Sequence, residues 1–203
     1  VYNLDYIYIG YDYETVPTAY HSLVADSLDA KLLQYARSGL RAVEFRYFLE
    51  GVYNDYDKDR VWDNTYFDND GNGFTLADLD AMNAKMNYPE AVKKTNVISV
   101  NVGSNDVFSF TLNVVLREMT EDANNDALKD IKDFLNNGGA LGTAFGKLIE
   151  YCQSVGQMAK LTTLITTTFA RAYEQFEENY DAVVKKVYEL NPCLLYTSPS
   201  PRD

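Results

Sequence analysis

The segment best suited to chemistry is Gly103-Ser104-Asn105-Asp106, which directly follows the apolar run NVISVNV at residues 96–102. A glycine followed by short polar residues exposes backbone N–H groups, and an asparagine adds a side-chain amide. Donors of this kind stabilise an oxyanion that develops during acyl transfer. The alternative is a turn between a strand and a helix, with Asn105 or Asp106 as the helix N-cap. Taken alone, the segment favours the cap.

Histidine and cysteine chemistry is limited by composition. The chain has one histidine, His21, and two cysteines, Cys152 and Cys193. Ser–His or Cys–His catalysis would have to use His21, but its position beside Tyr20 on a predicted helix favours an ordinary surface residue. Two cysteines without C-x-x-C spacing indicate neither a disulfide framework nor a zinc site. The composition therefore argues against a complete hydrolase.

Two further segments carry weaker signals. Asp68-x-Asp70-x-Asn72-Gly73 copies the first half of a calcium loop, but Leu79 occupies the twelfth position, where a glutamate would bind the ion. A plain polar loop is favoured, and no metal or cofactor is expected. The tyrosine-rich stretch 47–66, which includes Trp62, could stack on sugar rings. Half-buried aromatic residues that cover a long loop are the favoured interpretation.

The charge of the chain excludes some partners. Lys and Arg number 18 against 30 Asp and Glu, which gives a net charge of -12. No basic face is available for nucleic acid or for an anionic membrane surface. No apolar run reaches the roughly 18 residues needed to span a bilayer. The first ten residues lack a basic signal-peptide region. Val1 in place of Met suggests that the natural start is missing, so secretion or cell-surface display stays open.

The elements that must position these residues follow from hydrophobic periodicity. Strands that alternate with helices predict a parallel sheet with helical crossovers, and the second half of the chain predicts helices only. The predicted strands are residues 2–10, 31–36 and 96–102, the last buried and central. The predicted helices are residues 18–28, 40–49, 75–86, 89–95, 108–119, 126–135, 140–155 and 161–190.

Two blocks of the chain resemble the SGNH/GDSL hydrolases. NVISVNVGSNDV is similar to the block in which an apolar strand runs into G-x-N-D, and residues 19–49 are similar to the stretch from the first helix to the second block. The resemblance implies an oxyanion hole formed by the backbone N–H of Gly39 and the side-chain amide of Asn105. Gly103 and Asp106 would then line the substrate site beside them.

The catalytic residues of that family are not matched. In the best register, Asp5 and Gly10 fall where the Gly-Asp-Ser motif requires them, but Tyr6 occupies the place of the nucleophilic serine. The alternative is that the first residues are a sequencing or frame artefact. The C-terminal D-x-x-H block of the family is also missing.

These observations predict a three-layer, flavodoxin-like α/β fold with an added helical segment at about residues 108–190. Residues 1–192 would form one incomplete domain, and residues 193–203 (CLLYTSPSPRD) a non-native tail. We expect a fragment of a serine esterase for acyl or acetyl esters of lipids or carbohydrates, inactive as written, whose partner is a small-molecule or glycan ester. The alternatives are a non-catalytic carbohydrate-binding protein and a helical interaction module. The sequence does not indicate an oligomeric state.

Overall fold

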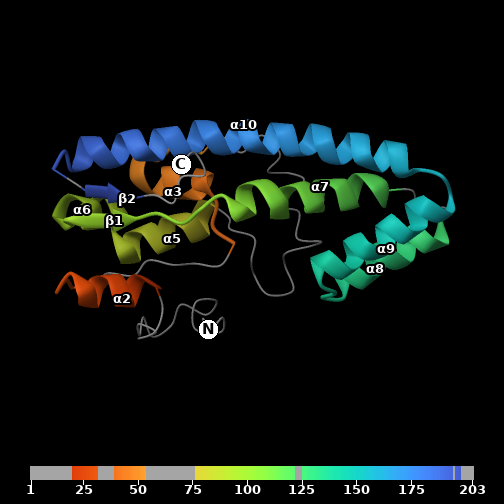
Figure 1. The fold of residues 1–203 in the computed structure, drawn as a ribbon, viewed down its shortest axis with the longest axis horizontal. Coiled ribbons are helices and arrows are strands. Elements are labelled where there is room, and N and C mark those ends of the chain that lie inside the picture. Colours follow the sequence, from red (N-terminus) through yellow and green to blue (C-terminus); the bar gives the residue numbers. More distant parts are fainter. Residues whose placement is uncertain (1–19, 32–38, 54–75, 122–124, 194, 198–203) are drawn as a thin grey trace.

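The computed structural model describes residues 20–31, 39–53, 76–121, 125–193 and 195–197, and helices make up most of them (Figure 1). The helices in chain order are α2 (Tyr20–Ser27), α3 (Ala42–Glu50), α5 (Leu76–Met86), α6 (Tyr88–Lys94), the π-helical turn η2 (Asn105–Ser109), α7 (Phe110–Met119), α8 (Asp126–Asn136), α9 (Leu141–Ser154) and α10 (Met158–Leu190).

Helix α10 is the element that joins the parts of the fold. Its 33 residues extend over about 50 Å at 1.5 Å per residue, and the helix runs along the length of the molecule (Figure 1). It packs successively against α9, α7, η2, α3 and α6. These contacts follow from one stripe of buried side chains at helical spacing, which consists of Leu161, Thr168, Ala172, Asn179, Val183 and Val187.

Two hydrophobic clusters lie at the two ends of α10. The first joins α7, α8 and α9 to the start of α10, and Leu116, Leu148 and Leu161 are fully buried within it. The second joins α3, α5 and α6 to the end of α10, where the rings of Phe48 and Tyr88 stack 4.5 Å apart. The segment from Gly103 to η2 lies between the two clusters (Figure 1).

The predicted α/β fold is wrong. The strands among the described residues are β1 (Val97–Ser99) and β2 (Leu195–Thr197), which form one parallel pair. Residues 96–102 are therefore not a buried central strand, because Val97 and Ser99 are exposed and β2 is the one strand in the described part of the chain that pairs with β1. The core is built by helices that pack on α10 instead of by a sheet covered on both faces. The assignment to an α/β hydrolase or lipase-like architecture fails for the same reason.

The helix predictions agree better with the structure. Helices α2, α3 and α5–α10 lie within a few residues of the predicted bounds. The predicted strands at residues 2–10 and 31–36 fall on residues that are outside the described part or at its edge. Of the helices that the structure describes, none combines the length and the apolar character needed to cross a bilayer.

Candidate functional site

The turn before α3 and the turn before η2 meet through a side-chain hydrogen bond. Gly39 has a left-handed backbone conformation, with φ of 84°, which glycine adopts without steric cost. The next residue, Leu40, accepts a 3.1 Å hydrogen bond from Nδ2 of Asn105. The structure therefore places Gly39 and Asn105 together, although 65 positions separate Leu40 from Asn105 in the chain.

The carboxylate of Asp106 makes a second link between the same elements. Its Oδ1 accepts a 2.7 Å hydrogen bond from the backbone N–H of Ala42, at the first turn of α3. An acceptor at this place satisfies one of the unpaired N–H groups at a helix N-terminus. Asn105 and Asp106 lie inside η2 and do not cap it. Asp106 is thus an N-terminal cap, but for α3 and not for the helix that follows it in sequence.

A buried ion pair lies beside these links. Arg41 and Glu44 are 5% and 0% exposed, and Nη2 of Arg41 donates to Oε1 of Glu44 at 2.7 Å. The other carboxylate oxygen of Glu44 accepts from the backbone N–H of Arg41, also at 2.7 Å. The hydroxyl of Tyr53 contacts both side chains. Several partners for each charge offset the cost of removing the pair from water.

Asp106 is a buried carboxyl that is only partly satisfied. It is 7% exposed, and its Oδ2 accepts no hydrogen bond from the described residues. The pKa of Asp106 is raised to about 7, mainly because the carboxyl is buried and also because the charge of Glu44 is close, while the Ala42 N–H and the Arg41 guanidinium act to lower it. The carboxyl is therefore able to gain and lose a proton near neutral pH.

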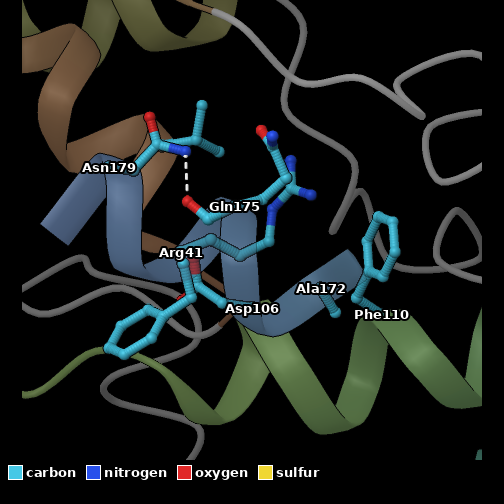
Figure 2. Close-up of a pocket in the computed structure, with 8 residues that line it drawn as sticks. Arg41, Asp106, Phe110, Ala172, Gln175 and Asn179 are labelled. Carbon is cyan, nitrogen blue, oxygen red and sulfur yellow. Dashed lines mark hydrogen bonds between the residues drawn. The ribbon is translucent and has the colours of Figure 1, made fainter. Parts of the chain in front are cut away.

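A small cavity of about 20 Å³ lies against Asp106 and Arg41. Its remaining wall consists of side chains from α3, α7 and α10, among them Phe110, Ala172 and Gln175, which Figure 2 labels. This volume accommodates about one water molecule. The cavity is too small for an organic substrate, so a ligand would contact the junction from its surface.

The backbone around η2 is unusual in two ways. Single π-helical turns are rare and occur frequently at functional sites. Gly103, just before the turn, has φ of 119°, and a Cβ built on it would lie 3.1 Å from Cε2 of Phe176. Glycine is therefore required both by the backbone conformation and by the close approach of a ring from α10.

The other predicted site residues have different outcomes. Gly103 is partly exposed and borders the junction, whereas Asp106 is buried beneath it. Asp5 and Tyr6 lie outside the described residues, as do most of the candidate calcium loop and most of the stretch 47–66. No group of three or more His, Cys, Asp or Glu side chains in the described ranges is arranged to hold a metal ion.

Sequence reasoning missed Arg41, Glu44 and Phe176. The spacing of Arg41 and Glu44, three positions apart at the start of a helix, is a signal for the ion pair, but nothing in the sequence indicates that the pair is buried. The approach of Phe176 to Gly103 depends on how α10 packs.

The comparisons with known proteins found no relative. No family model, no curated protein and no solved structure matches this chain. They give no support to a hydrolase, esterase or lipase family, and the function has to be argued from the junction itself.

Proposed function

We propose that the junction between residues 39–44 and 103–109 binds the carbonyl oxygen of an acyl ester without cleaving it. The observation that carries it is the hydrogen bond from Asn105 to Leu40, which places the amide beside the Gly39 turn.

The junction offers suitable donors for a ligand oxygen. The side-chain nitrogen of Asn105 has two hydrogens, of which Leu40 accepts one. Oδ1 of Asn105 accepts from the hydroxyl of Ser109 at 3.3 Å, which fixes the orientation of the amide. A donor held in place in this way needs little reorganisation when it meets a polarised carbonyl.

Cleavage would need a nucleophile and a base. The one histidine of the chain is His21 on α2, which lies away from η2 in Figure 1. The Asp106 carboxyl is buried against α3, so it supports Ala42 and is not in a position to attack a ligand. The chain is accordingly assigned binding of the ester but no acyl transfer.

The test is an NMR titration of the ¹⁵N-labelled chain with triacetin, a soluble and uncharged ester. We expect the backbone signal of Gly39 and the side-chain amide signals of Asn105 to shift together. Asn105→Ala should abolish the response at Gly39. Asn101→Ala should retain it, because Asn101 is exposed on the same segment and its side chain makes no hydrogen bond to the described residues of the junction.

Two results would contradict the proposal. The first is an absence of shifts at Gly39 and Asn105 up to the solubility limit of triacetin. The second is release of p-nitrophenol from p-nitrophenyl acetate above the buffer rate, with loss of that activity in Asn105→Ala, which would show a complete catalytic site. Thermal unfolding of each variant checks that it is folded.

A further inference from the structure

An exposed row of aromatic side chains lies next to the junction. Phe169, Tyr173, Phe176 and Tyr180 recur on α10 at intervals of three or four residues, so they share one narrow face of the helix. Phe108 of η2 extends the row, with its ring 5.9 Å from that of Phe169. These five side chains are called the aromatic row.

The rings contact one another in two groups, Phe108 with Phe169 and Tyr173 with Phe176 and Tyr180, and three of the five side chains are exposed whereas Phe176 and Tyr180 are half-buried. The ring centroids of Tyr173 and Phe176 are 6.4 Å apart, and those of Phe176 and Tyr180 are 5.3 Å apart. Phe108 is 64% exposed, Tyr173 43% and Phe169 38%. Eleven positions from Phe169 to Tyr180 correspond to about 16 Å along the helix axis. A contiguous exposed patch of this kind marks a binding surface more often than a scattered apolar residue does.

The row is fixed to the proposed ester site at two points. Phe176 packs against Gly103, and Phe108 belongs to the same π-helical turn as Asn105. A ligand that lies along the row can therefore place a substituent at the junction. This juxtaposition makes the aromatic row an extension of the same site.

Charge and shape restrict the ligand. Residues 169–184, which span the row, contain four acidic side chains (Glu174, Glu177, Glu178 and Asp181) and one basic side chain, Arg171, and Glu178 pairs with Arg46. The surface along the row is therefore net negative, which disfavours phosphate-bearing or otherwise anionic ligands. The row lies on an open helix face, and the cavity beside it holds only about 20 Å³, which is too small to enclose an acyl chain.

We infer that the aromatic row binds a neutral oligosaccharide, so that the acyl ester at the junction is an ester of a sugar. This inference rests on the proposed function. The C–H face of a sugar ring is flat and weakly positive, and it complements the negative face of an aromatic ring. The acidic side chains beside the row accept hydrogen bonds from sugar hydroxyls.

The test uses isothermal titration calorimetry and NMR on the full chain with xylohexaose and cellohexaose as probes. Tyr173→Ser and Phe108→Ser should raise the Kd by about threefold to tenfold each, from the usual worth of an aromatic stacking contact. Tyr188→Ser is the matched control, because Tyr188 is on the same helix and is also 43% exposed but lies outside the row. It should bind like the parent chain.

Several outcomes overturn the inference. One is binding that Tyr173→Ser and Tyr188→Ser weaken equally. Others are no binding of either sugar, binding of neutral phosphatidylcholine vesicles through the row, and a dimer in sedimentation that Tyr173→Ser dissociates. If triacetin shifts the Gly39 signal but neither sugar binds, the inference about the row is wrong and the ester proposal is still supported. Sugar binding without triacetin shifts would support the row and contradict the ester site.

Discussion

Two regions of the described fold use different interactions to bury their side chains. In the cluster of α7, α8 and α9, the buried residues are apolar, with Leu116 and Leu148 fully enclosed. Between α3 and η2, the buried residues include Arg41, Glu44 and Asp106. Apolar packing alone can hold helices together. The charged groups of the junction are not needed for that purpose, and burying them costs stability unless each has a partner.

This difference separates a structural region from a candidate site. Side chains that serve only to pack need no polar groups in fixed positions, and the core of the α8–α9 hairpin contains few such groups. At the junction, an amide, a carboxyl and an ion pair are held in defined positions by the backbone of residues 40–42, which leads into α3. Buried, partly satisfied polar groups are where function is most often found.

The largest expected effect is the loss of Glu44. Glu44→Ala leaves the Arg41 guanidinium buried without its main partner, which should lower the free energy of unfolding by about 3–5 kcal/mol. Urea denaturation at pH 7 measures the change. Glu90→Ala is the control, because the Glu90–Lys93 pair is exposed on α6 and solvent screens it, so its loss should cost much less than the loss of Glu44. Equal losses would show that the junction pair is not buried as described.

The apolar cluster of α7, α8 and α9 should lose stability when a cavity is made in it. Leu148→Ala removes a fully buried side chain from the α9 face of the first cluster, and we expect a loss of about 2–5 kcal/mol. The loss should be the same at pH 5 and pH 8, because the cluster is apolar. Leu76→Ala, at a side chain that is 50% exposed, should change stability by less than about 0.5 kcal/mol. A pH-dependent loss in Leu148→Ala would contradict the contrast between the apolar cluster and the charged junction.

Asp106 should give the junction a pH dependence. Its folded-state pKa of about 7 lies above the ordinary value of 3.8. Between these two pH values the folded chain therefore binds more protons than the unfolded chain does. The contribution of Asp106 to stability is therefore complete below about pH 4 and is lost as the pH rises through 7, by at most about 1.4 kcal/mol per pH unit. Asp106→Asn should remove this slope in urea denaturation between pH 4.5 and 7.5. An unchanged slope in Asp106→Asn would show that other titratable groups cause the pH dependence.

The smallest effect is expected at Gly103. Gly103→Ala forces a side chain into a positive φ and against the Phe176 ring, and a loss of about 1 kcal/mol or more is expected. The NMR signals of the Phe176 ring should shift. Gly146→Ala is the matched control, since a Cβ at Gly146 meets nothing within 4 Å and alanine is the better helix former. A Gly103→Ala chain as stable as the parent would mean that Phe176 does not approach this turn.

Much of the helical structure was predictable from local signals. The repeat of Leu161, Ala172, Val183 and Val187 indicates one long amphipathic helix, and α10 carries these residues on its buried stripe. Asn125 is a favourable N-cap residue, and its side chain accepts from the N–H of Leu128 at the start of α8. Such patterns depend on neighbours in sequence, so a single sequence reveals them.

The sheet and the details of the site were less predictable. The β-branched run at residues 96–102 looks like a buried strand, but burial depends on what packs against it, and β1 finds only β2. The resemblance predicts that Gly39 and Asn105 act together, and in the structure the Asn105 amide bonds to Leu40, the residue after Gly39. It did not reveal that Asp106 caps α3 or that Arg41 and Glu44 are buried, because these are contacts between distant segments.

The most direct test of the junction is an NMR pH titration of the side-chain carboxyl carbon of Asp106 together with the backbone amide of Ala42. A junction as described requires both signals to titrate with one common midpoint near pH 7. A carboxyl midpoint near 4, with an Ala42 amide that does not follow it, would show that Asp106 is exposed and that α3 and η2 do not meet.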